Sequence, residues 1–122
     1  LNNYFCAIEH VTNLDFIQKF SKGDMSRVKK YVMMYIQSAD EEMPVIEKSF
    51  HDKDYKKLKT ASHTLKSIAA YMGMERAQQL LKKIEDSASN ESVTEEMAHD
   101  ITQLKEMITL SKDELKAFIA QN

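Results

Sequence analysis

The sequence predicts an all-α fold, an antiparallel four-helix bundle with a short additional N-terminal helix. Only two glycines and one proline occur among 122 residues, so the chain has few residues that favour turns. Apolar residues recur at intervals of three and four along most of the chain, which is the spacing of one face of an α-helix. We find no strand signal, and long amphipathic segments joined by short connections favour a bundle.

The first predicted helix is short and covers "TNLDFIQKF". Thr12 precedes Asp15 by three residues, a spacing that resembles a capping box, and Gly23 lies just past the end of the helix. We expect this helix to act as a lid on the bundle.

The second predicted helix starts at Asp24 and presents one apolar stripe. Pro44 lies within it, and we expect this proline to kink or split the helix because it lacks the backbone N–H that a helix interior needs. The stripe consists of Met25, Val28, Val32, Tyr35, Ile36, Ala39, Met43, Ile46 and Phe50.

Three more helices are predicted after the segment "HDKD". One begins near Asp54 as its cap and ends at Gly73, and the next covers residues 74–89. The last follows the linker "SASNES" and starts at a capping box formed by Ser92 and Glu95.

Composition predicts one domain over residues 1–122, with residues 1–11 as a linker or a helix extension. With 17 basic and 19 acidic side chains the formal net charge is -2, so no global field attracts the chain to nucleic acid or to anionic lipid. Cys6 is the only cysteine, which excludes an internal disulfide and suits the reducing cytoplasm. We see neither a membrane span nor a signal peptide, and we expect a cytoplasmic protein.

The stretch "SHTLKSIAAYMGM" places His63 on the polar side of its helix. A helix advances about 100° per residue, so the apolar neighbours of His63 fall more than roughly 110° away from it. The residues that fall within roughly 60° of the histidine are Lys56, Lys59, Lys66, Ser67 and Ala70.

This outward stripe allows two interpretations, a solvated lysine-rich face or a site for a phosphorylated imidazole. Ser67 and Ala70 are small, so a large partner can approach the ring of His63. Lys66 lies one turn along, where its ammonium could reach an anion held on the ring, and the other two lysines of the stripe add positive potential. These details favour the phosphoryl site over the solvated face.

"HTLKSIAAYMG" resembles the motif of the histidine-containing phosphotransfer (HPt) domain: a histidine, a lysine at plus three, a small residue at plus four and a glycine at plus ten. The resemblance implies a four-helix bundle with the histidine on its second long helix, preceded by a proline-containing helix such as "SADEEMPVIEKSF". It also implies that the histidine accepts a phosphoryl group from the aspartyl phosphate of one receiver domain and passes it to the aspartate of another.

Carried over to this sequence, the resemblance makes His63 the phosphoacceptor and Lys66 the lysine beside the phosphate. Ser67 stands in place of the usual glycine, which narrows access to the ring or donates a hydrogen bond. Glu85 stands where many members carry glutamine, and an acid there resembles the chemotaxis-kinase phosphotransfer domain, in which a glutamate holds the imidazole. The alternative is that Glu85 is a surface carboxylate paired with Lys82.

The resemblance also implies the partners, which are response-regulator receiver domains, among them that of a hybrid sensor kinase. The divalent cation belongs to the receiver, so we expect no cofactor and no metal site in this chain. We expect a monomer with no nucleic-acid or membrane partner, and a docking surface that includes Lys56, Lys59 and Ala70.

Two other functions are compatible with a helical bundle of this size. A non-catalytic four-helix module that binds receivers without transferring phosphate is the alternative, and it predicts binding that does not depend on His63. A kinase with its own ATP site fits poorly, because no Gly-rich phosphate loop is visible and five helices leave no room for a nucleotide-binding domain. We therefore expect a phosphorelay carrier rather than an enzyme.

Overall fold

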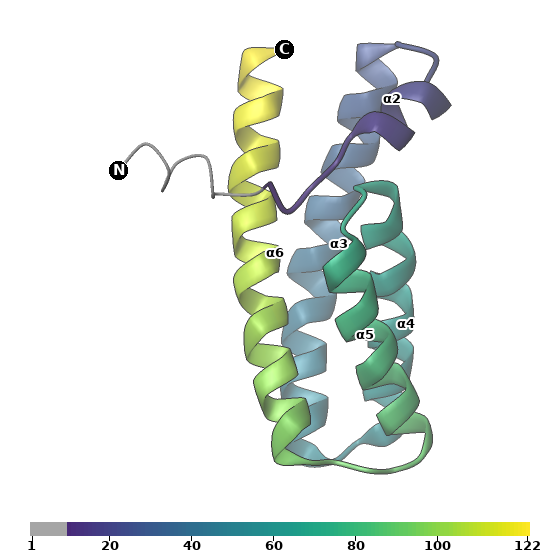
Figure 1. The fold of residues 1–122 in the computed structure, drawn as a ribbon, viewed down its shortest axis with the longest axis vertical. Coiled ribbons are helices and arrows are strands. Elements are labelled where there is room, and N and C mark those ends of the chain that lie inside the picture. The colour runs from purple at the N-terminus through teal and green to yellow at the C-terminus, as the bar shows by residue number, and fades with distance from the viewer. Residues whose placement is uncertain (1–9) are drawn as a thin grey trace.

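The computed structural model describes residues 10–122 and confirms the all-α prediction (Figure 1). Four long helices run side by side in alternating directions, and a short helix lies near the end of the bundle where the chain enters it. No strand occurs within the described residues. Most of the expected segment over residues 1–11 lies outside them. The helices are α2 (Asp15–Phe20), α3 (Met25–Asp52), α4 (Tyr55–Tyr71), α5 (Glu75–Ser89) and α6 (Glu95–Gln121).

Helix α3 starts as predicted, because the Asp24 side chain accepts hydrogen bonds from the backbone N–H groups of Ser26 and Arg27. Of the two expected effects of Pro44, a kink or a split, the split is wrong, since α3 continues without interruption from Met25 to Asp52. Pro44 is exposed, so the carbonyl that lost its helical donor can bond to water on the solvent side. One helix therefore spans the full length of the bundle.

Both predicted capping boxes are wrong. Helix α2 follows Leu14, which makes no side-chain cap, and the Thr12 hydroxyl instead donates to Glu114 of α6 at 2.7 Å. Helix α6 is capped by Thr94, whose hydroxyl accepts from the N–H of Met97 at 3.2 Å, and Ser92 lies in the preceding turn. A capping pattern in sequence therefore located each helix start only to within about two residues.

The cap and the end predicted for α4 are confirmed. Asp54 accepts from the N–H of Lys57 at 3.2 Å, and Gly73 follows the helix with φ +64°, a conformation that L side chains rarely adopt. A Cβ atom at Gly73 would overlap the carbonyl oxygen of Asn13. Glycine at this position thus allows the N-terminal segment to pass close to the turn between α4 and α5.

The core runs along the axis of the bundle and is lined by the inner faces of all four long helices. Within the core, the hydroxyls of Tyr35 and Ser111, both fully buried, form a 2.7 Å hydrogen bond. Burial raises the pKa of Tyr35 to about 12, so this phenol stays neutral. None of the helices within residues 10–122 is both long and apolar enough to cross a bilayer.

Residues 10–14, which we call the strap, precede α2 in the chain and pass from the side of α6 to α2 (Figure 1). The carboxylate of Glu114 on α6 accepts from the N–H of Val11 at 2.8 Å and from the N–H and hydroxyl of Thr12. Further along, the N–H of Asn13 donates to the carbonyl of Met72 at 2.8 Å. Beyond the strap, α2 places Ile17 in the core with no exposed surface, so α2 covers part of the bundle.

Candidate functional site

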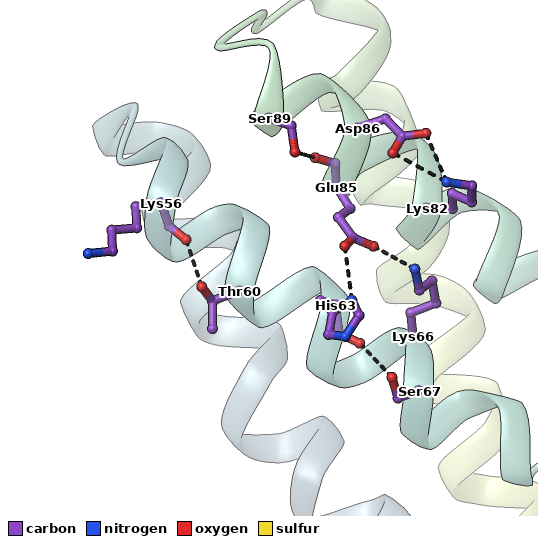
Figure 2. A network of polar contacts seen from close by, with 9 residues as sticks. All are labelled: Lys56, Thr60, His63, Lys66, Ser67, Lys82, Glu85, Asp86 and Ser89. Atoms are coloured by element: carbon purple, nitrogen blue, oxygen red, sulfur yellow. Dashed lines mark hydrogen bonds and ion pairs between the residues drawn. The ribbon is translucent and has the colours of Figure 1, made fainter.

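His63 lies on the outer face of α4, with 62% of its side chain exposed (Figure 2). Its helix is oriented by Leu58, Leu65 and Ala69, which are buried on the opposite face. The outward direction predicted from helical rotation is therefore what the structure has. An exposed imidazole in the middle of a rigid helix is accessible to a large partner.

Glu85 of α5 bridges two residues of α4 (Figure 2). Its Oε2 lies 2.9 Å from Nδ1 of His63, and its Oε1 lies 2.6 Å from Nζ of Lys66. The carboxylate is mostly shielded, with 14% of the Glu85 side chain exposed. The alternative pairing of Glu85 with Lys82 does not occur in the structure, because Lys82 pairs with Asp86 at 3.3 Å instead.

The electrostatics of this bridge determine the tautomer of His63. Partial burial alone would raise the pKa of Glu85, but hydrogen bonds from Lys66 and His63 outweigh it and lower that pKa below its ordinary value. Glu85 is therefore ionised at neutral pH and can only accept hydrogen bonds. In the neutral imidazole, Nδ1 of His63 therefore carries the proton, and Nε2 has its lone pair directed away from Glu85.

The sequence predicts that the ammonium of Lys66 can reach an anion on the ring of His63, but in the structure this ammonium is already bound to a carboxylate. Only 25% of its side chain is exposed, and its Nζ is bound to Glu85 rather than projecting freely. The ammonium and the imidazole nevertheless share one carboxylate, so they lie next to each other. Lys66 therefore fixes Glu85 and keeps a positive charge close to the ring.

Ser67 and Ala70 leave the approach to His63 open, since both are small and exposed. The Ser67 hydroxyl donates to the backbone carbonyl of His63 at 3.1 Å, so it is occupied within its own helix and does not bond to the ring. Beside them, a shallow groove between α4 and α5 is lined by Lys66, Ser67, Ala70, Glu75, Gln78, Gln79 and Lys82.

Lys56 and Lys59 extend the positive face along α4 toward its N-terminus. Both side chains are exposed, and neither forms an ion pair within residues 10–122. Figure 2 shows the Lys56 side chain pointing away from the other labelled residues, while its backbone carbonyl accepts from the hydroxyl of Thr60. These charges are available to a negatively charged partner.

Sequence reasoning missed a second exposed feature, four aromatic rings that we call the aromatic cluster. It consists of Phe16 and Phe20 of α2, Tyr31 of α3 and Tyr71 of α4. Neighbouring ring centroids lie 5.8, 6.0, 5.7 and 6.1 Å apart around a closed circuit. The spacing of Phe16 and Phe20 was the available signal, because residues four apart share one side of a helix.

The remaining histidines take no part in the site. His10, His51 and His99 are all exposed on other segments. Within residues 10–122 no cluster of three or more histidine, cysteine, aspartate or glutamate side chains could hold a metal ion.

Comparison with protein families gives one match, to the model described as Hpt domain, over residues 30–114. The match covers more than half of the chain and includes the His63 motif and Glu85. Comparisons with curated proteins and with solved structures gave no match.

Proposed function

This chain belongs to the Hpt domain family, and we propose that it carries a phosphoryl group on His63 between the aspartates of receiver domains in a two-component phosphorelay. The observation that supports this most directly is the hydrogen bond between Nδ1 of His63 and the ionised carboxylate of Glu85. In the neutral ring this contact places the proton on Nδ1 and leaves Nε2 with a free lone pair, which is what a nucleophile needs.

The proposed transfer needs no general base from this chain. The lone pair of Nε2 attacks phosphorus in line, the N–P bond forms, and the O–P bond to the receiver's aspartate breaks, releasing a carboxylate. Nδ1 of His63 keeps its proton, so the phosphorylated ring carries a positive charge next to the Glu85 carboxylate. The reverse steps return the phosphoryl group to a second receiver.

Lys66 has two roles in this proposal. Before transfer it orients Glu85 through the 2.6 Å contact. After transfer the phosphoryl oxygens add negative charge near the ring, and the ammonium of Lys66 lies close enough to share its contacts between them and Glu85. The lysine thereby stabilises the phosphorylated form without being a proton donor.

The receiver is proposed to dock over the exposed sides of α4 and α5. Ser67 and Ala70 provide a flat approach, while Lys56 and Lys59 complement the acidic residues that surround the aspartate of a receiver. The divalent cation would reside on the receiver, so the chain itself needs no cofactor. We place this phosphocarrier in the cytoplasm, acting as a monomer with no kinase activity of its own.

The test uses receiver domains from the same organism that carry a radioactive phosphoryl group on their aspartates. Incubation should transfer label to this chain, and the label should be lost in acid and retained in base, as for a phosphoramidate. His63→Gln should abolish labelling. His99→Gln, which changes an exposed histidine on α6, is the matched control and should label normally.

Two outcomes contradict the proposal. Label that survives acid, or that persists in His63→Gln, places the phosphoryl group on another residue. Receiver binding with no transfer in either direction indicates the alternative function, a protein-interaction module that binds receivers without carrying phosphate.

A further inference from the structure

His51, in the last turn of α3, has the same kinds of partner as His63. Its Nδ1 lies 3.2 Å from Oδ1 of Asp52, and Oδ2 of that carboxylate lies 2.8 Å from Nζ of Lys48. At His63, one carboxylate likewise bridges Nδ1 of the imidazole and the ammonium of a lysine. We call His51, Asp52 and Lys48 the α3 triad. The chain thus holds a second imidazole on an acid that a lysine binds in turn.

The carboxylate of the α3 triad determines the tautomer of His51. Hydrogen bonds from Lys48 and from His51 lower the pKa of Asp52 below its ordinary value, so Asp52 is ionised at neutral pH and can only accept. In the neutral ring, Nδ1 of His51 therefore carries the proton and Nε2 has a free lone pair. Because 88% of the His51 side chain is exposed, a reagent in solution can reach this ring.

Two other exposed histidines lack this arrangement. Nε2 of His99 lies 3.0 Å from the amide nitrogen of Gln103, which donates to it and occupies its lone pair. Nδ1 of His10 lies 3.6 Å from Glu114, which is too far for a hydrogen bond. His10 and His99 therefore serve as internal controls for the reactivity of His51.

The turn between α3 and α4 carries positive charge beside the α3 triad. Lys53, Lys56 and Lys57 are exposed and form no ion pair within residues 10–122. Asp54, an acid of the same turn, caps α4 by accepting from the backbone N–H of Lys57. The excess of free ammonium groups raises the local concentration of small anions.

We propose that His51 is a second phosphoacceptor, with Asp52 and Lys48 as its positioning residues, and that its donors are small phosphoryl compounds of the phosphoramidate class. A receiver is not the donor, because its proposed docking site covers α4 and α5, whereas His51 lies on α3. The inference goes beyond transfer through His63 and does not depend on it.

The proposed step is a phosphoryl transfer between two nitrogens. The lone pair of Nε2 of His51 attacks phosphorus in line and forms the new N–P bond. The P–N bond of the donor breaks, and its protonated amine departs as ammonia with the bonding electron pair. Nδ1 keeps its proton, so the phosphorylated ring is cationic beside the Asp52 carboxylate, and the ammonium of Lys48 lies close enough to contact the phosphoryl oxygens.

The first experiment treats the His63→Gln variant with phosphoramidate, so that the functional histidine cannot contribute. Peptide mass spectrometry under alkaline conditions, in which a phosphoramidate bond survives, locates and quantifies the label. His51 should be labelled about tenfold faster than His10 or His99, by analogy with the effect of a carboxylate that orients an imidazole elsewhere. Equal rates at the three histidines would overturn the inference.

The second experiment tests the positioning residues in the same background. Asp52→Ala should slow labelling of His51 about tenfold, and Asp52→Asn, which keeps an acceptor oxygen, should restore part of the rate. Lys48→Ala should also slow labelling, because it releases the carboxylate. The matched control is the pair of Lys82→Ala and Asp86→Ala, which removes an exposed ion pair of the same spacing on α5 and should change nothing.

Nitrogen NMR of the His51 imidazole separates positioning from a general effect on the fold. In Asp52→Ala the fraction of neutral rings protonated at Nδ1 should fall while the thermal unfolding temperature stays the same, since all three side chains of the triad are exposed. An unchanged tautomer together with unchanged labelling in Asp52→Ala would contradict the proposed role of the triad.

Phosphorylated receivers provide the test of the donor class. They should leave His51 unlabelled in His63→Gln, and label on His51 from this source would show that the donor assignment is wrong. Failure of receivers to label His63 in the unaltered chain contradicts the proposed function alone. Failure of phosphoramidate to label His51 in preference to His10 and His99 contradicts this inference alone.

Discussion

Nδ1 of His63 lies 2.9 Å from Oε2 of Glu85, and this contact joins α4 to α5 at the centre of the site. The same carboxylate binds Lys66, so one partly buried acid orients both a nucleophile and a cation. Glu85 contacts the ring of His63. Its replacement should therefore alter the tautomer and the orientation of the imidazole while leaving the fold intact.

Glu85→Ala is expected to slow phosphotransfer about tenfold, by analogy with the loss of other hydrogen-bond partners that orient an imidazole. Without the acceptor, the proton of His63 distributes between both nitrogens and the ring rotates. Glu85→Gln keeps an acceptor oxygen and should retain most of the rate. Nitrogen NMR of the imidazole reports the tautomer directly, and an unchanged tautomer in Glu85→Ala would show that Glu85 does not orient the ring. Asp86→Ala, on the next position of α5, is the control.

The lowered pKa of Glu85 also predicts a pH dependence of stability. Its folded-state pKa lies below its ordinary value of 4.5, so the ionised form stabilises the folded state. This contribution is complete above the ordinary value and is lost as pH falls through the lowered one. The difference in unfolding free energy between the unaltered chain and Glu85→Gln should therefore shrink in acid. Urea unfolding at a series of pH values measures it, and a difference that grows in acid contradicts the assignment.

Ser62 precedes the functional histidine and is fully buried, yet its hydroxyl makes no hydrogen bond within residues 10–122. Ser62→Ala should therefore raise the unfolding free energy by about 1 kcal/mol, because it removes an unpaired polar group and favours the helix. Ser49→Ala is the matched control, since the buried Ser49 hydroxyl donates to the carbonyl of Val45 at 2.5 Å. Chemical unfolding should show less stabilisation, or a loss, for Ser49→Ala. Equal effects would show that Ser62 is satisfied by water.

The direction of His63 was predictable from sequence because it depends only on rotation within one helix. The contact between Lys66 and Glu85 was not, since it depends on how α4 and α5 are offset along their axes. Capping failed for a different reason: in "NESVTEE" both Ser92 and Thr94 can cap, and the capping-box spacing, which only Ser92 has, to Glu95, favours the residue that the structure does not use. Packing of Val93 against the core accompanies the choice of Thr94.

The position of the strap could not be predicted from the sequence either, because it also depends on contacts between separate segments of the chain. Val11 and Glu114 are separated by 103 positions, and no periodicity relates them. Gly73 was correctly predicted to end a helix, but its second property, the close approach of Asn13, follows only from the path of the strap. Local conformation was thus readable from sequence, whereas contacts between distant segments were not.

Gly73→Ala should therefore destabilise the protein more than Gly23→Ala does. Both glycines have positive φ, so each substitution strains the backbone, which costs about 1 kcal/mol. Only at Gly73 would the new methyl group meet the strap, and there we expect a loss of about 2 kcal/mol or more. Thermal or urea unfolding compares the two variants. Equal losses would mean that the strap moves aside without cost.

The placement of the receiver on the positive face of α4 is tested by reversing one charge. Lys59→Glu should raise the half-saturating concentration of phosphorylated receiver about tenfold at low salt, mainly through slower association. The difference should nearly vanish at high salt, because the screening length falls from about 10 Å at 0.1 M to about 3 Å at 1 M. Thermal stability should not change, since Lys59 is exposed and forms no ion pair in the described part of the chain. Lys116→Glu, an exposed lysine on α6, is the control, and if it slowed transfer while Lys59→Glu did not, the receiver would dock against α6.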